Sequence, residues 1–306
     1  MPELPEVETM RRGIGFLVGR RIAGAEFPRG PVRPILVQPP PATVARRIVG
    51  RTVAGVERRG KRVLIGLAAA AGVPRRLLVV EPRMTGRFVI GAPPTADHVR
   101  LVLRLAAGRD AAATSVSFWD LRGLGTVRLV DDRGLERLCG PERLGPDGLT
   151  VTAADLVRRL DRSRRAIKVA LLDQRVVAGI GNIYAAEILF RAGIDPRSPC
   201  RRIGADAWER IAAETRRILA EAVRCEGSSI GDETYRTADD RPGRFQRRHR
   251  VYGRAGEACS GCGGAVVRIV QAQRSTFFCP HCQRRATVGG GGGRRPRELP
   301  SAPRVP

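Results

Sequence analysis

The sequence predicts an α+β protein of several domains: an N-terminal β-sandwich with a leading helix, then a helical domain, then a C-terminal zinc ribbon. Three observations support this class. Short apolar or alternating runs recur between residues 52 and 130, amphipathic segments follow from residue 152, and four cysteines form two C-x-x-C pairs. A length of 306 residues with 42% hydrophobic composition suits about two folded cores and a small appendage.

The N-terminal region is predicted to hold one helix followed by a sheet domain. The apolar stripe of this helix is Val7, Met10, Ile14 and Leu17. Their spacing is helical, and Pro5 suits a first turn, where its missing N–H costs nothing. Candidate strands follow at residues 52–57, 62–67, 77–81, 99–105, 116–120 and 126–130. Turns rich in Gly, Pro and Arg separate them, a rhythm typical of a β-sandwich or barrel.

A connection rich in proline and glycine, residues 139–150, leads into the helical domain. Thr152 and Asp155 form a capping-box pattern for a helix to about Leu160. Further helices are expected at residues 166–173, at 183–192, and from a cap at Asp206 to near Cys225. The expected domains are 1–138, 151–244 and 245–288, with a linker at 139–150 and a disordered low-complexity tail at 289–306.

A long loop is expected at residues 226–243, where Gly and Pro stand near both ends. Irregular segments of this length in a compact protein are usually functional or mobile. The loop carries the acidic residues Asp232, Glu233, Asp239 and Asp240.

The net charge of +25 and the sequence pI near 11.5 indicate a polyanionic partner, most often a nucleic acid, although a generally basic proteome is the plain alternative. Residues 241–306 alone hold 14 arginines against two glutamates. No membrane partner is expected, because no run of about 18 apolar residues and no secretory signal pattern is present. We therefore expect an intracellular, cytoplasmic protein. Its scattered cysteines (Cys139, Cys200 and Cys225) suit a reducing compartment.

Lysine is scarce in this chain. Lys61 and Lys168 are the two lysines among 55 Lys and Arg residues. A primary amine can lose its proton or act as a compact point charge, which guanidinium cannot do, so both lysines are candidates for chemistry. Retention by chance is the alternative for each.

The strongest local signal is the cysteine pattern. The four thiols are those of Cys259, Cys262, Cys279 and Cys282. Two such pairs close a tetrahedral site around one structural Zn²⁺. The residues between the pairs alternate like a hairpin with its tip at 271–275, so the metal would fix Arg274 where it can meet a phosphate. His281 is expected to be a bystander, because four cysteines already complete the coordination.

A second motif lies at residues 164–194, where two helical stretches flank a glycine-containing link. Asn182 stands at the start of the second stretch, after Gly179 and Gly181. Free backbone N–H groups at a helix start can bind a phosphate, although a plain helix cap is the alternative for Asn182.

Together these segments resemble one known family. The opening PELPEVE, the run ending at Lys61, GIGNIYAAE, VYGR and the final AQRSTFFC are similar, in this order, to formamidopyrimidine-DNA glycosylases, also called 8-oxoguanine-DNA glycosylase/AP lyases. The resemblance covers roughly residues 2–283. It implies a helix-two-turns-helix fold for the helical domain, and a monomer, associated with the bacterial nucleoid, that acts on damaged double-stranded DNA.

The resemblance also implies the catalytic residues. Removal of the initiator Met would make Pro2 the N-terminal residue, whose secondary amine attacks the sugar C1′ of a damaged nucleotide. Glu3 would move protons at the sugar, with Glu6 nearby in a role left open. Lys61 would contact phosphate and lesion, and Arg274 would bind DNA phosphate within the catalytic set.

The remaining implied site residues bind DNA: Met84, His98, Arg122, Leu124, Lys168 and Asn182. Met84, Arg122 and the residue at 124 would fill the gap left by a nucleotide that leaves the stack. The family motif Arg-Arg-Phe-Gly is replaced by Arg122-Gly123-Leu124-Gly125. An aromatic wedge residue and a cation are therefore missing. We expect this loss to affect the search for lesions and the preference for the base opposite the lesion.

The predicted function is base-excision DNA repair by a bifunctional glycosylase that removes oxidised purines through Pro2 and then cleaves the strand by β,δ-elimination. An endonuclease VIII-like enzyme for oxidised pyrimidines or abasic sites is the first alternative, but that branch usually has Gly where this chain has Leu4. A DNA-binding relative without catalysis is the second alternative. A zinc-ribbon protein of the translation or transcription machinery is the third, and it leaves the N-terminal motif and GIGNIYAAE unexplained.

Overall fold

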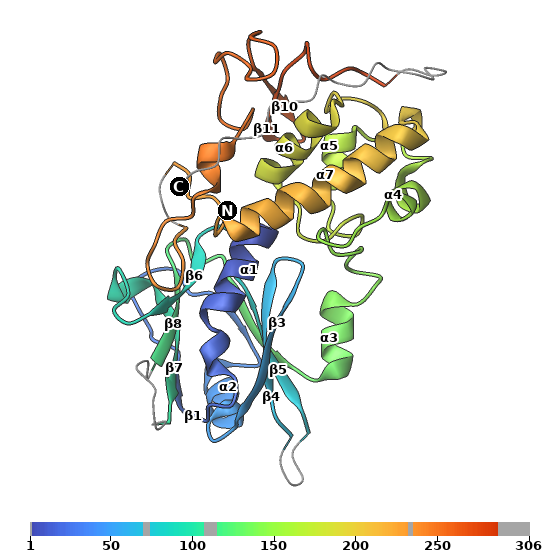
Figure 1. Ribbon diagram of the computed structural model, residues 1–306. Helices are drawn as coiled ribbons and strands as arrows, with labels where there is room; N and C mark the ends of the chain where they lie inside the picture. Colours follow the sequence, from blue (N-terminus) through green and yellow to red (C-terminus); the bar gives the residue numbers. More distant parts are fainter. Residues whose placement is uncertain (1, 70–73, 107–114, 232–234, 287–306) are drawn as a thin grey trace. The chain divides into compact units, whose positions relative to one another are not determined.

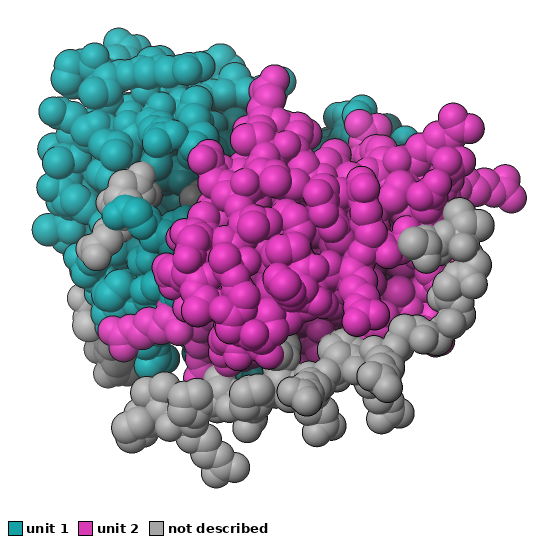
Figure 2. Space-filling view, turned by 90° about the horizontal axis from the view of Figure 1, so that it is seen from above, with its two compact units in different colours: residues 1–143, 222–246 teal, residues 144–221, 247–306 magenta. Residues whose placement is uncertain are grey.

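The computed structural model describes residues 2–69, 74–106, 115–231 and 235–286. The chain divides into two compact units, drawn in two colours in Figure 2. The first comprises residues 1–143 and 222–246, and the second comprises residues 144–221 and 247–306. The expected domain boundaries stay predictions, and the expected disordered tail lies outside the described residues. No helix in the described part of the chain is long and apolar enough to cross a membrane.

The first unit is a sandwich of two sheets with a leading helix, α1 (Leu4–Gly13). Its strands are β1 (Ile22–Glu26), β2 (Leu36–Gln38), β3 (Val53–Arg59), β4 (Arg62–Leu67), β5 (Arg76–Glu81), β6 (Gly86–Ile90), β7 (Val99–Leu105), β8 (Ser115–Asp120) and β9 (Thr126–Val130). One sheet has the order β2-β9-β5-β4-β3 and the other β1-β7-β8-β6 (Figure 1). Apolar residues of both sheets and of α1 form one core, so the predicted β-sandwich with a leading helix is confirmed.

All six predicted strands are present, as β3, β4, β5, β7, β8 and β9. The sequence did not reveal β1, β2, β6, or the helices α2 (Pro41–Ile48) and α3 (Asp132–Cys139). β1 reads IAGAE, with Gly and Ala where β-branched residues would signal a strand. β2 has three residues and pairs in parallel with the distant β9, so its local sequence gives no periodic signal.

The second unit contains the predicted helices. They are α4 (Ala153–Leu160), α5 (Ile167–Leu171), α6 (Asn182–Ala192) and most of α7 (Ala205–Arg224). The capping box of Thr152 and Asp155 is present. The predicted cap at Asp206 is wrong, because α7 already begins at Ala205 and Asp206 lies within its first turn. A carboxylate there still favours the helix through its dipole without being the cap.

A hairpin of β10 (Val267–Gln271) and β11 (Arg274–Phe278) follows in the same unit, as predicted. Gln271 pairs with Arg274, which leaves a two-residue turn of Ala272 and Gln273. Both have positive φ, 46° and 61°, the conformation that a tight hairpin turn requires and that Asn-Gly adopts more easily. Arg274 therefore follows directly after a strained turn.

Buried His249 makes the second unit sensitive to acid. Its ring packs edge-on against Tyr252, with ring centroids 5.6 Å apart. Burial, aided by the charge of Arg254, lowers the pKa of His249 to about 4. The unfolded chain binds a proton at this histidine near pH 6.5, whereas the folded chain does so only near pH 4. The free energy of unfolding therefore falls as the pH drops from about 6.5 to about 4.

We expect this group to remove about 3 kcal/mol of unfolding free energy between pH 7.5 and pH 4. Urea unfolding of wild type and of His249→Phe at both pH values measures it. The variant keeps an aromatic ring beside Tyr252, and the carboxylates and thiols titrate in both proteins. Equal pH dependence of the two proteins would contradict the prediction.

Candidate functional site

The N-terminal peptide is held by Glu6, a residue of the first turn of α1. Glu6 Oε2 accepts a hydrogen bond of 2.8 Å from the backbone N–H of Glu3. Glu6 Oε1 accepts another of 2.8 Å from the backbone N–H of Ser228. Pro2 and Glu3, two of the four predicted catalytic residues, therefore enter the helix from a defined position at its start. Ser228, in the 226–243 segment, was not anticipated from the sequence.

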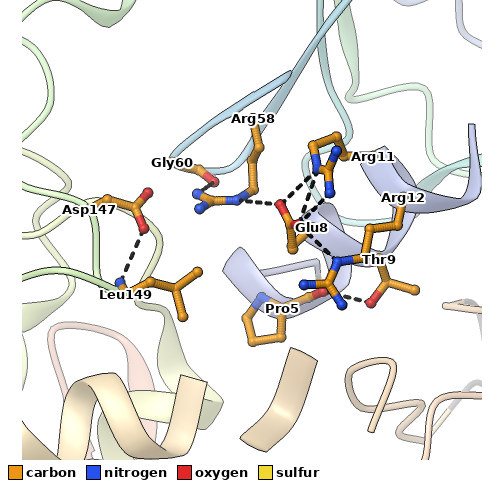
Figure 3. Close-up of polar contacts among 9 residues, drawn as sticks. All are labelled: Pro5, Glu8, Thr9, Arg11, Arg12, Arg58, Gly60, Asp147 and Leu149. Carbon is orange, nitrogen blue, oxygen red and sulfur yellow. Dashed lines mark hydrogen bonds and ion pairs between the residues drawn. The ribbon is translucent and has the colours of Figure 1, made fainter. Parts of the chain in front are cut away.

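A cluster of charges connects α1 to the turn that carries Lys61 (Figure 3). Glu8 forms ion pairs with Arg11 at 2.8 Å, Arg12 at 3.0 Å and Arg58 at 3.2 Å. Burial acts to raise the pKa of the Glu8 carboxyl, but the hydrogen bonds and charges of these arginines hold it below its ordinary value. Glu8 is thus an anionic anchor for three cations.

Arg58 extends this connection to the β3–β4 turn. Its Nη1 donates to the carbonyl oxygen of Gly60 at 3.0 Å, while its Nε contacts Glu8 (Figure 3). Gly60 has a φ of 56°, as a tight turn before β4 requires. Lys61 follows directly, so the turn that presents it is tied to the helix that begins at the N-terminal peptide.

Two loops at one edge of the sandwich bring Met84 and Arg122 together. Asp120 accepts from Thr85 Oγ1 at 2.5 Å and from the backbone N–H of Gly125 at 2.7 Å. Arg122 Nη1 lies 3.6 Å from Met84 Sδ. Met84 and Arg122 are exposed, whereas Leu124 is half-buried. Buried Asp120 therefore fixes both loops, a role that the sequence did not indicate.

His98 lies apart from these contacts. Its ring centroid is 5.7 Å from that of Trp119, and its Nδ1 is 2.7 Å from Thr95 Oγ1. Trp119 Nε1 donates to the same Thr95 oxygen at 3.1 Å. The structure gives His98 a local packing role, and its predicted contact with DNA stays a prediction.

In the second unit, Lys168 fastens the start of α6 to the hairpin. Its Nζ donates to Asn182 Oδ1 at 2.7 Å, to Thr276 Oγ1 at 2.7 Å and to the Ser275 carbonyl at 3.0 Å. Asn182 Nδ2 also donates to the Ser275 carbonyl at 3.0 Å. Gly181, not Asn182, is the N-cap residue of α6, so the plain-cap alternative for Asn182 is wrong. Arg274 directly precedes these hairpin contacts.

Replacing Lys168 by Met should weaken DNA binding by about tenfold without changing its salt dependence. The ammonium is buried and its three N–H groups already have protein acceptors, so its loss would release Asn182 and the hairpin. DNA titrations from low to high salt measure the affinity and its salt dependence. Lys61→Met is the matched control, because it removes the other lysine, which is expected to contact a phosphate directly. A salt slope reduced by about one for Lys168→Met would instead support direct contact with a phosphate.

The four cysteines form one cluster with the geometry of a zinc site. Their Sγ atoms all lie within 4.8 Å of one another. Cys259 and Cys282 have Sγ atoms 3.8 Å apart, and those of Cys262 and Cys279 are 3.5 Å apart. Four thiolates at tetrahedral zinc lie about 3.8 Å apart, so the donors fit one structural Zn²⁺. His281 is not part of the cluster among the described residues, as predicted.

Removing this metal should abolish ordered presentation of Arg274. We expect one zinc per chain and, for Cys279→Ser, loss of that zinc together with at least about a tenfold loss of DNA affinity. Metal release with a thiol reagent and DNA titration are the measurements. Cys225→Ser is the control, because that thiol lies outside the cluster. Full DNA affinity in zinc-free protein would contradict the prediction.

A sheet domain, a helical module and a four-cysteine zinc finger on a chain of net charge +25 define a nucleic-acid-binding protein. Family models match in the same order. The N-terminal domain of formamidopyrimidine-DNA glycosylase matches residues 1–127, its H2TH domain residues 144–234, and the zinc finger found in FPG and IleRS residues 256–285. The chain belongs to the formamidopyrimidine-DNA glycosylase family.

Individual relatives agree. The formamidopyrimidine-DNA glycosylase of Cereibacter sphaeroides is 41% identical over 93% of this chain and 100% of its own length. That of Chloroflexus aggregans is 40% identical, covering 92% and 98%. The crystal structure of MutM (Fpg) from Thermus thermophilus matches with a TM-score of 0.78 at 38% identity, covering 92% and 98%. A Lactococcus lactis Fpg mutant bound to Fapy-dG-containing DNA matches with a TM-score of 0.79 at 30% identity, covering 93% and 100%.

Proposed function

We propose that this protein is a DNA-repair glycosylase and AP lyase that excises oxidised purines, 8-oxoguanine and formamidopyrimidines, from double-stranded DNA. The observation that carries the proposal is the N-terminal peptide Pro2-Glu3, held at the start of α1 by Glu6 in a chain of this family. Relatives named formamidopyrimidine-DNA glycosylase and the Lactococcus lactis Fpg complexes with Fapy-dG DNA and with abasic-site DNA support the substrate.

The chemistry begins once Met1 has been removed and Pro2 carries a free secondary amine. The amine nitrogen attacks the sugar C1′, the bond from C1′ to the base breaks, and the base leaves with a proton. The sugar ring opens to an iminium between Pro2 and C1′. Glu3 exchanges protons with the sugar during these steps in this proposal.

Strand cleavage follows from the same iminium. Loss of a proton from C2′ expels the 3′ phosphate, and a second elimination expels the 5′ phosphate. Hydrolysis of the iminium then returns the amine. In this proposal the phosphates of the substrate are bound by Lys61, Asn182 and Arg274. Two of these side chains are cations and one is an amide, and they lie on a turn, at a helix start and on a hairpin.

Met84, Arg122 and Leu124 fill the gap beside the extruded nucleotide, and Met84 and Arg122 already lie together. The four cysteines would fill every position of a tetrahedral Zn²⁺, so the bound metal would contribute structure only. The monomeric state and the cytoplasmic, nucleoid-associated location stay predictions.

One observation favours a wider substrate range that includes oxidised pyrimidines. A Lactococcus lactis Fpg structure, 28% identical with a TM-score of 0.79, is a complex with DNA containing an oxidised pyrimidine. Gly123 and Leu124 also remove a cation and an aromatic ring from the expected wedge. Weaker stacking of wedge residues in the gap left by the extruded nucleotide should make the enzyme less selective among damaged bases.

Borohydride trapping tests the proposal. Processed wild-type protein is incubated with duplexes that contain 8-oxoguanine opposite cytosine, an oxidised pyrimidine, or an abasic site. We expect a trapped complex on the 8-oxoguanine and abasic duplexes, and an additional complex on the pyrimidine duplex would support the wider substrate range. Trapping on the pyrimidine and abasic duplexes alone would support the endonuclease VIII-like alternative. Salt-sensitive binding without any trapping would show a DNA-binding relative that lacks catalysis.

A further inference from the structure

A buried arginine of β6 pairs with an acidic residue of the 226–243 segment. Arg87 Nη1 lies 2.8 Å from Asp240 Oδ1. The Arg87 side chain is 3% exposed, whereas that of Asp240 is 58% exposed. The two residues are 153 positions apart in the sequence and belong to the same unit. The pair therefore connects a loop to the sheet beneath it.

The surroundings of Arg87 make this pair important. Arg87 lies directly opposite Trp119 in the pairing of β6 and β8, and its guanidinium carbon is 5.3 Å from the Trp119 ring centroid. Its Nε is buried and has no hydrogen-bond partner among the described residues. A buried guanidinium with so few partners is costly unless a carboxylate compensates its charge. Asp240 supplies that carboxylate from the loop.

The backbone around Asp240 is held in an uncommon conformation. Asp240 has a φ of 58°, a left-handed value that Asp tolerates better than most side chains. The turn is closed by hydrogen bonds from Asp240 N to the Thr237 carbonyl at 3.0 Å and from Thr237 N to the Arg241 carbonyl at 2.8 Å. Arg236 Nε adds a second contact to Asp240 Oδ1 at 3.1 Å. This turn places the carboxylate on Arg87.

This turn and Tyr235, which precedes it, are docked on the sandwich. The backbone N–H of Ile90, the last residue of β6, donates to the Ala238 carbonyl at 2.9 Å. Ala238 and Tyr235 are 1% and 5% exposed and belong to the sandwich core. A Cβ added at Gly13 would lie 2.8 Å from the Cβ of Ala238, so α1 approaches the segment closely.

Hydrogen bonds continue from this docked segment to the N-terminal peptide. Ser229 Oγ donates to the Tyr235 carbonyl at 2.5 Å. The backbone N–H of the preceding Ser228 donates to Glu6 Oε1, and Glu6 Oε2 accepts from Glu3 N, both at 2.8 Å. These contacts, together with the short stretches of backbone between them, connect the Arg87 pair to Glu3, the residue next to Pro2.

We propose that Asp240 and Arg87 are positioning residues for the reaction at the N-terminal amine. Their ion pair fixes residues 235–243, and this docked segment in turn holds Ser228 against Glu6 and thereby fixes the peptide that carries Pro2. The inference rests on the proposed function, because it assigns the pair to the reaction of that amine. Loss of the pair slows covalent attack on lesion and abasic substrates alike and leaves DNA affinity unchanged.

The chain offers a matched control in the neighbouring acid. Asp239 and Asp240 have side chains that are equally exposed, at 58%, and Asp239 lies 3.7 Å from Arg241 at the surface. Asp240→Asn and Asp239→Asn each raise the net charge by one unit, so both alter the general attraction to DNA equally. They differ in that Asp240→Asn removes the charge that pairs with buried Arg87 and with Arg236, whereas Asp239→Asn removes a pair with Arg241 at the surface.

Three measurements decide the inference. They are the single-turnover rate of borohydride trapping on an abasic duplex, the Kd for a duplex with an uncleavable abasic analogue, and amide hydrogen exchange at Ile90 and Ser228. For Asp240→Asn we expect trapping about tenfold slower and exchange at both amides about tenfold faster, with Kd within about twofold of that of Asp239→Asn. Asp239→Asn and the rescue variant Asp240→Glu should trap at close to the wild-type rate.

Each contrary outcome is specific. Equal trapping and exchange in the two Asn variants would overturn the inference. Faster exchange at Ile90 with unchanged trapping would also overturn it, because the pair would then hold the loop without positioning the amine. If the wild type traps on no duplex, the proposed function fails. Amide exchange still tests the positioning path then: an unchanged exchange rate at Ser228 in Asp240→Asn would overturn it.

Discussion

A protein that retains Met1, for example behind an N-terminal tag, should form no borohydride-trapped complex on abasic DNA, a loss of at least about a thousandfold. Retaining Met1 converts the Pro2 nitrogen into an amide, which is not nucleophilic. It also moves the nearest free amine by at least one residue, about 3.8 Å along the chain, beyond the reach that covalent attack allows. Denaturing gels after borohydride reduction measure the loss.

Two variants separate the amine from its surroundings. Pro2→Ala replaces the secondary amine by a primary amine and loses the fixed backbone angle of proline, so we expect trapping about 10- to 100-fold slower. Glu3→Gln keeps the proline amine and should lower base excision more than trapping on abasic DNA. All three proteins should bind the abasic analogue within about threefold of wild type. Normal trapping by the tagged protein would assign the nucleophile elsewhere, with Lys61 as the next amine to test.

The parts of the fold that the sequence predicted are those with a local signal. The capping box at Thr152 and Asp155 is contained in four residues, and the zinc ligands are defined by their spacing. β4 and β5 are apolar runs between turns, so their burial follows from composition. α3 was missed although Asp131 caps it, because Gly134 interrupts its helical pattern.

The parts of the site that the sequence did not predict depend on distant partners. Scarcity identified Lys168 as unusual, but its acceptors Ser275 and Thr276 lie 107 and 108 residues away. Arg87 and Asp240 are separated further still, at 153 residues. A single sequence contains no periodic signal for such pairs, since each forms only when two elements pack. For the same reason the expected roles of Lys168 as a phosphate ligand and of the acidic loop near DNA stay predictions.

Gly123, where this chain departs from the family motif, should tolerate no side chain. Its φ is 60°, and a Cβ built there would lie 2.4 Å from the carbonyl oxygen of Arg33. We expect Gly123→Ala to lower the free energy of unfolding by at least about 3 kcal/mol, since a left-handed conformation costs an alanine about 1–2 kcal/mol before the collision is counted. Urea unfolding measures this loss.

Gly91 provides the control. It also has a positive φ, 84°, but a Cβ there would meet nothing within 4 Å. Gly91→Ala should therefore cost only the backbone term of about 1–2 kcal/mol. Equal destabilisation at the two positions would show that the carbonyl of Arg33 moves aside easily. Packing would then not be the reason that this chain has glycine at position 123 where the family motif has arginine.

The same geometry predicts how the missing wedge can be restored. Gly123→Arg, which returns the cation of the family motif, should slow excision of 8-oxoguanine, because the loop must shift and would carry Arg122 away from Met84. Leu124→Phe returns the aromatic ring at a half-buried position that already carries a side chain. It should increase excision severalfold, in line with a stacking gain of roughly 1–3 kcal/mol per base. Single-turnover excision rates of the two variants distinguish two cases. Faster excision by both would show that the motif has only lost interactions, whereas slower excision by Gly123→Arg alone would show that the loop conformation depends on its glycine.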